Sequence, residues 1–153
     1  MSLEDAYQLT GVSDIQSLFR VFNEEDQRLM HSWQWDYDNP DLLTNKIKEI
    51  LSCLSPEQLS DEEFWRCQEM LWFWHHHAVS CAIRKRNKAS AEFHVARALR
   101  YMGDDHPNMI TQLLNLLIHD QLEEAEKWAQ KVGESEQEAA EMLLTTYKAG
   151  GFF

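Results

Sequence analysis

The amino-acid sequence predicts an all-α protein, an antiparallel helical-hairpin bundle or short α-α superhelix of six to seven helices in a single domain, residues 1–153. Only 5 Gly and 3 Pro interrupt the chain, fewer than the usual ~7% and ~5% would supply. Apolar residues recur at helical spacing, and capping patterns separate the apolar segments. Hydrophobic residues make up 44% of the chain, which is enough to form a core.

The first two predicted helices occupy the N-terminal third of the chain. Ser13 and Asp14 cap a helix whose apolar residues run to Trp33 and which ends at "WDYDNP". Asn39-Pro40-Asp41 then starts a second helix with an apolar stripe that ends at Leu54. The sequence "SPEQ" separates this helix from the next.

The third predicted helix is long and central. Ser60 and Glu63 fit a capping box, which predicts a helix from Asp61 to Arg86. This segment is apolar on more than one face, a pattern typical of a helix surrounded by neighbours. We therefore expect this helix to be buried. Its residues Trp72, Trp74 and Ala78 should lie in the core together with Leu114 from a later helix.

Four shorter helices are predicted after Asn87. The fourth contains Met102 and ends at Gly103, and the fifth begins with Pro107 in its first turn. The sixth runs through Val132, after which residues 135–138 form a capping box for the seventh. We expect the end of the seventh helix to fray at "AGGFF".

Part of this region resembles a known repeat family. "LLNLLIHDQLEEAEKWAQKV" and "ASAEFHVARAL" resemble helices of the tetratricopeptide repeat, over about residues 72–133. The matching positions are Ala91, Ala98, Leu99, Leu116, Leu122 and Ala125, and the departures are Val79, Asp120, where the family has a turn glycine, and Val132. The resemblance implies stacked helical hairpins whose groove binds a partner protein.

Charge is distributed unevenly along the chain. The net charge of −12 argues against general nucleic-acid binding. Residues 84–100 nevertheless hold six Lys and Arg against one Glu. Some of these cations complement the C-terminal dipole of the third helix. They also predict a surface that binds a partner through negative groups: an acidic peptide segment, the carboxylates of a partner protein or a phosphate. The predicted partner-binding residues are Arg84, Lys85, Arg86, Lys88, His94, Arg97 and Arg100.

The sequence "HHH" at residues 75–77 raises the question of a metal site. Successive helical residues project about 100° apart, so His75, His76 and His77 cannot all bind one ion. We expect no bound metal and no cofactor, although one of these histidines could join Cys81, His94 or a distant carboxylate. Catalysis by His77 with Cys81 is the other chemical alternative. The three cysteines, Cys53, Cys67 and Cys81, are expected to be buried free thiols.

These patterns favour a non-enzymatic protein-protein interaction or adaptor domain over the alternatives. Those alternatives are a helical metalloprotein or enzyme, and a small acidic inhibitor or chaperone. The first residues are acidic, whereas a signal peptide begins with cations before an apolar stretch. The sequence also has no run of 18 apolar residues that could span a membrane. We expect a cytoplasmic protein that does not enter membranes, and the sequence leaves its partner and oligomeric state open.

Overall fold

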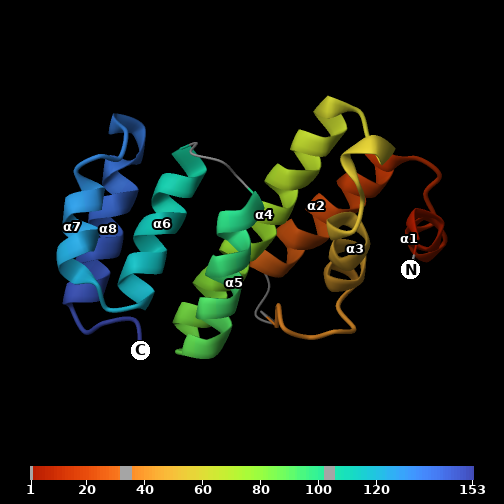
Figure 1. The fold of residues 1–153 in the computed structure, drawn as a ribbon. Coiled ribbons are helices and arrows are strands. Elements are labelled where there is room, and N and C mark those ends of the chain that lie inside the picture. The colour runs from red at the N-terminus through yellow and green to blue at the C-terminus, as the bar shows by residue number, and fades with distance from the viewer. Residues whose placement is uncertain (1, 32–35, 102–105) are drawn as a thin grey trace. The chain divides into compact units, whose positions relative to one another are not determined.

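The computed structural model describes residues 2–31, 36–101 and 106–153, and these contain eight α-helices, two short 3-10 helices and no strand (Figure 1). The predicted all-α class is therefore confirmed. Among the described residues, none of the helices combines the length and apolar character of a membrane span. Trp33, Met102 and Gly103, which figured in the expected helix pattern, lie outside the described residues.

The chain divides into two compact units, Met1–Trp74 and His75–Phe153. The boundary falls inside one helix, α4 (Asp61–Arg84), so each unit contains part of it. The single domain expected over residues 1–153 stays a prediction.

The first unit begins with a helix that was not predicted from the sequence. Helix α1 (Leu3–Thr10) starts at a capping box in which the Asp5 backbone N–H donates to Ser2 Oγ and the Ser2 backbone N–H donates to the Asp5 carboxylate. It ends at Gly11, whose φ of 73° is the left-handed conformation that glycine adopts easily. Both signals are present in the sequence, and this additional helix brings the observed number above the six or seven predicted.

Helices α2 (Ile15–His31) and α3 (Leu43–Ser52) pack with α1 and are followed by the 3-10 helix η1 (Pro56–Gln58). Asp14 caps α2 as predicted, accepting the Ser17 backbone N–H at 2.8 Å. Helix α3 begins later than predicted because the Asn39 side chain accepts the Asp41 backbone N–H at 2.9 Å in a local turn. Trp74 is fully buried and meets Tyr37 edge-on, with ring centroids 5.1 Å apart.

Helix α4 begins as predicted and ends two residues early. The Ser60 backbone N–H donates to Glu63 Oε1 at 2.9 Å, and the Glu63 N–H donates to Ser60 Oγ at 3.2 Å, which confirms the capping box. At its other end Arg86 takes a φ of 56°, and the Asn87 N–H donates to the Ala82 carbonyl at 2.8 Å. This left-handed turn ends the helix at Arg84 instead of Arg86. The predicted core residues are buried: Trp72, Trp74, Ala78 and Leu114.

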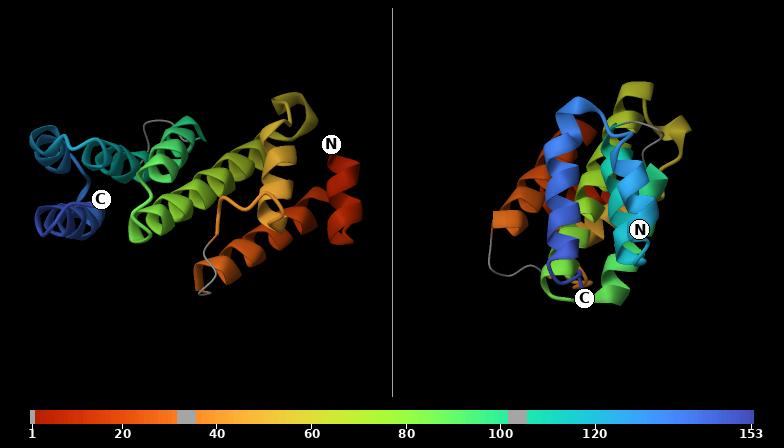
Figure 2. Two further views of the ribbon diagram at one scale, coloured as in Figure 1. Left: turned by 90° about the horizontal axis from the view of Figure 1, so that it is seen from below. Right: turned by 90° about the vertical axis from the view of Figure 1, so that its left-hand side faces the viewer.

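The second unit continues through α5 (Lys88–Tyr101), α6 (His106–Ile118), α7 (Leu122–Ala129), the 3-10 helix η2 (Glu134–Glu136) and α8 (Gln137–Lys148). Helix α6 is central, since it packs against α5, α7 and α8. Helices α7 and α8 lie side by side and are viewed nearly along their axes in the left panel of Figure 2. Helix α7 ends three residues before the predicted Val132, and η2 occupies the predicted start of the seventh helix.

Two turns of this unit have informative backbone conformations. Asp120, between α6 and α7, has a φ of 57°. Gly151 has a φ of 75°, and its N–H donates to the Tyr147 carbonyl at 2.6 Å. This turn brings Phe152 back against Tyr147, with ring centroids 5.5 Å apart, and only 5% of Phe152 is exposed. Helix α8 ends at Lys148, directly before the "AGGFF" segment where fraying was expected, and burial of the Phe152 ring packs this turn against the helix.

Candidate functional site

The three successive histidines enter different surroundings. His75 is buried, His76 is partly exposed at the wall of a cavity, and His77 is half-buried. Their divergence follows from the ~100° rotation between successive helical residues. Among the described residues, no group of three or more His, Cys, Asp and Glu side chains is placed to hold a metal ion.

His75 and His94 form a buried pair between α4 and α5. Their Nδ1 atoms are 3.0 Å apart, and Tyr101 stacks on the His75 ring at a centroid distance of 5.7 Å. One Nδ1 donates its proton and the other accepts it, so this hydrogen bond is lost if both Nδ1 atoms are protonated. His94 was expected on the partner-binding surface. That expectation is wrong, because His94 is only 2% exposed and its ring faces the core.

The cysteines divide by burial. Cys67 and Cys81 are buried as expected, whereas Cys53, the C-cap of α3, is exposed and corrects that expectation. Burial raises the pKa of the Cys67 thiol to about 11, which leaves almost no reactive thiolate at neutral pH. Cys81 lies four residues after His77 on α4, but its burial gives a substrate little access to the sulfur.

The cations around the α4–α5 turn do not gather with those farther along α5. Lys85 and Arg86 are exposed at the end of α4, and Lys88 Nζ lies 3.8 Å from an Asp120 carboxylate oxygen. Helix α5 runs away from this turn, and at ~1.5 Å per residue Arg100 lies about 18 Å along the helix from Lys88. The single cluster expected from the sequence is therefore two separate groups.

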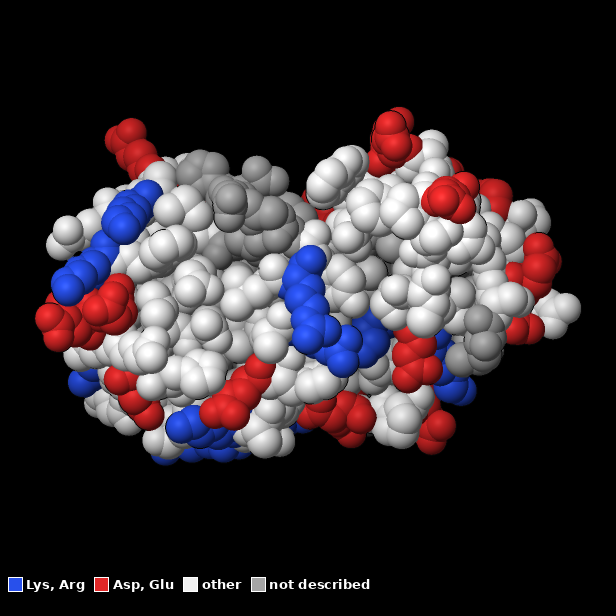
Figure 3. Space-filling model, in the orientation of Figure 1, with Lys and Arg blue, Asp and Glu red and all other residues white. Residues whose placement is uncertain are grey.

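The second group forms what we call the α5 surface, defined by Phe93, Arg97 and Arg100. Phe93 is 49% exposed, and the Arg97 guanidinium lies 5.2 Å from the centre of its ring. The three residues follow i, i+4, i+7 spacing, so they share one face of the helix. The opposite face is buried, with Ala91, His94, Val95 and Ala98 in the core. Figure 3 shows Lys and Arg side chains over α5 and side chains of both signs over α7.

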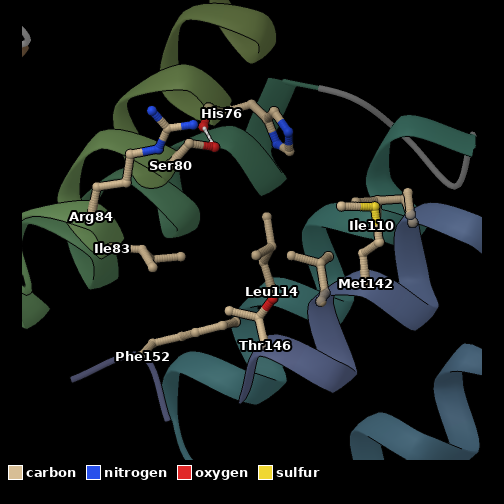
Figure 4. Close-up of a pocket in the computed structure, with 11 residues that line it drawn as sticks. His76, Ser80, Ile83, Arg84, Ile110, Leu114, Met142, Thr146 and Phe152 are labelled. Atoms are coloured by element: carbon tan, nitrogen blue, oxygen red, sulfur yellow. Dashed lines mark hydrogen bonds between the residues drawn. The ribbon is translucent and has the colours of Figure 1, made fainter. Parts of the chain in front are cut away.

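A cavity of about 430 Å³ lies within the second unit, between the last turns of α4 and helices α6 and α8 (Figure 4). Helix α4 contributes three polar lining residues, His76, Ser80 and Arg84, whose i, i+4, i+8 spacing places them on one face, and α8 contributes the polar Thr146. Ser80 Oγ donates to the His76 backbone carbonyl at 3.3 Å, the usual bond of a helical serine to its own helix. Arg84 was predicted as a surface residue of the basic region, and the structure places it at this cavity.

Burial is the main influence on the pKa of His76, the histidine of the cavity wall. It lowers the pKa of His76 to about 4, with a smaller contribution from the charge of His77. His76 is therefore neutral at pH 7, and Arg84 is the cation of the cavity wall. The cavity was not predicted from the sequence, although the spacing of His76, Ser80 and Arg84 on a long helix was a usable signal.

Comparison of the chain with models of protein families, with curated proteins and with solved structures found no match.

Proposed function

We propose that this protein is a non-enzymatic protein-binding module that uses the α5 surface to hold an acidic segment of a partner. The main observation in support of this proposal is the exposed ring of Phe93 beside the guanidinium of Arg97. Phenylalanine and arginine are both enriched in protein–protein interfaces relative to the rest of the surface. Arg100, exposed one turn further along, extends the positive charge.

Charge complementarity favours an acidic partner. Among the described residues, no ion pair joins Arg97 or Arg100 to a carboxylate, whereas Lys88, Lys127 and Lys148 each have an acidic neighbour within 4 Å. The rest of the chain is strongly acidic, so a positive partner surface would have other places to bind. An acidic segment with an aromatic or aliphatic residue suits the combination of charge and exposed ring on the α5 surface.

The proposal extends to a tetratricopeptide-like arrangement of hairpins in this part of the chain. Asp120 occupies the position where that family has a turn glycine, and its left-handed φ of 57° is the conformation that glycine supplies. This agreement supports a similar turn between α6 and α7. The α5 surface does not depend on it.

A direct test measures binding of a short fluorescein-labelled peptide of alternating glutamate and phenylalanine by fluorescence anisotropy. We expect saturable binding that weakens as salt rises, because exposed charges are screened within ~8–10 Å at physiological ionic strength. The double variant Arg97→Glu with Arg100→Glu should lower the affinity about tenfold, since it replaces two attractions of ~0.2–1 kcal/mol each by repulsions. Phe93→Ala should also weaken binding.

A matched control makes the same change of charge elsewhere. The variant Lys127→Glu with Lys131→Glu alters two exposed lysines at the end of α7 and should leave peptide affinity nearly unchanged. Equal loss in both double variants would show attraction to net charge alone and would reject the α5 surface. Circular dichroism confirms that each variant keeps its helices.

A further inference from the structure

The cavity between α4, α6 and α8 has the composition of a small-molecule site. Its volume of about 430 Å³ lies within the ~300–1,000 Å³ typical of ligand pockets. It is open to solvent, because Ser80, Arg84, Ala139, Met142 and Thr146 on its wall are exposed. All of its lining residues belong to the unit His75–Phe153.

The two sides of the cavity differ in chemistry. Helix α6 contributes Ile110 and Leu114, helix α8 contributes Met142, Leu143 and the hydroxyl of Thr146, and the C-terminal turn contributes Phe152. Helix α4 contributes Ile83 and most of the polar groups, and Figure 4 shows His76, Ile83 and Leu114 directed at the same space. An occupant must therefore bury apolar surface against α6 and α8 and present a polar group to α4.

The sign of that polar group follows from the charges on the wall. Arg84 is a permanent cation, and none of the described lining residues is acidic. A guanidinium binds a carboxylate through two parallel N–H···O bonds, which a neutral group cannot reproduce. Ser80 lies one turn away, and its hydroxyl, which donates to the His76 carbonyl, can rotate to donate to a ligand oxygen instead. The wall therefore favours an anion with an oxygen pair.

The size of the cavity selects a small molecule over a partner helix. A docked helix is ~10–12 Å across with its side chains and contacts its groove over several turns. A volume of about 430 Å³ admits a single flexible chain instead. Met142, 65% exposed at the cavity's edge, is a flexible apolar side chain that can adapt to such a chain.

We propose that this cavity binds a medium-chain fatty carboxylate, with its alkyl chain among Ile110, Leu114 and Phe152 and its carboxylate on Arg84. The site is separate from the α5 surface and does not depend on the protein-binding function proposed above.

Isothermal titration calorimetry of the full chain with hexanoate, octanoate and decanoate, each below its micelle concentration, tests the proposal. Each added methylene should strengthen binding about fourfold until the cavity is filled, since burial of one CH₂ corresponds to that ratio. Arg84→Gln should weaken decanoate about tenfold and leave decanol unchanged. Ala139→Phe, at an exposed position of the wall, should fill the cavity and weaken both ligands.

Two matched variants complete the experiment. Lys85→Gln removes a neighbouring charge, and Ala89→Phe adds a ring on exposed α5; neither residue lines the cavity, and neither change should affect decanoate. Absence of decanoate binding would overturn the proposal, as would binding that survives Ala139→Phe in a protein with unchanged circular dichroism. Equal affinity for decanol and decanoate, unaffected by Arg84→Gln, would also overturn it, because it would indicate a purely apolar pocket suited to a partner's side chain.

Discussion

Replacing His76 by asparagine should flatten the dependence of stability on pH. Burial lowers the His76 pKa from 6.5 to about 4 in the folded protein. As pH falls below 6.5, the unfolded chain therefore takes up a proton that the folded protein resists, and protonation favours unfolding. The stabilising contribution is complete above pH 6.5 and is lost progressively between pH 6.5 and pH 4.

The magnitude follows from those two pKa values. At about pH 5 the loss is at most about 2 kcal/mol, from ~1.4 kcal/mol per pKa unit. This is an upper limit because His76 as a residue is only partly buried, and nearby water screens its charge. His76→Asn cannot take up the proton, so its free energy of unfolding should fall less between about pH 7.5 and about pH 5.

Urea denaturation followed by tryptophan fluorescence measures this difference at both pH values. The comparison uses the change with pH in each protein, so any effect of the substitution that is independent of pH cancels. His31→Asn is the control, because His31 is an exposed residue of α2 and should retain the pH dependence of the parent protein. Identical pH dependence in His76→Asn and the parent would refute the reasoning and show that the ring is solvated in the fold.

Three further predictions concern the fold. Ser60→Ala removes the N-cap of α4 and should lower the free energy of unfolding by about 1 kcal/mol in urea denaturation; no loss would mean that Glu63 is sufficient. Leu113→Ala, at a fully buried position, should cost about 2–5 kcal/mol by the same measurement, and a loss below about 1 kcal/mol would show that the core collapses around the gap. A disulfide reagent should modify Cys53 rapidly in the native protein, and Cys67 and Cys81 only after unfolding; three equally fast thiols would contradict their burial.

The helices were predictable because their signals are local. Asp14, Ser60 and Glu63 act on backbone groups within one turn, so the sequence alone places these caps. Apolar spacing likewise predicted the burial of Trp72 and Trp74. Helix α1 was not predicted, although its signals are equally local: Ser2 and Asp5 mark its start and Gly11 marks its end.

The candidate sites were predictable only in part. Composition identified the basic region, but the direction of α5 after Asn87 separates Lys85 and Arg86 from Arg97 and Arg100. Local patterns also could not show that His94 turns inward, because its pairing with His75 depends on how two helices meet. The cavity could not be predicted because Phe152 lines it by packing against helices that lie earlier in the chain, and local sequence patterns do not show this contact.

The sequence by itself determined the helical class, the excess of acidic residues and the N-terminal caps of α2 and α4, since propensity, charge and capping act within a few residues. Tertiary structure decided which faces of those helices are covered. It made His75 and His94 a buried pair, left Phe93 exposed beside Arg97, and placed Arg84 on the wall of an apolar cavity. The physical reason is that burial depends on neighbours distant in sequence, and the same helical pattern can present a side chain to solvent, to a core or to a cavity.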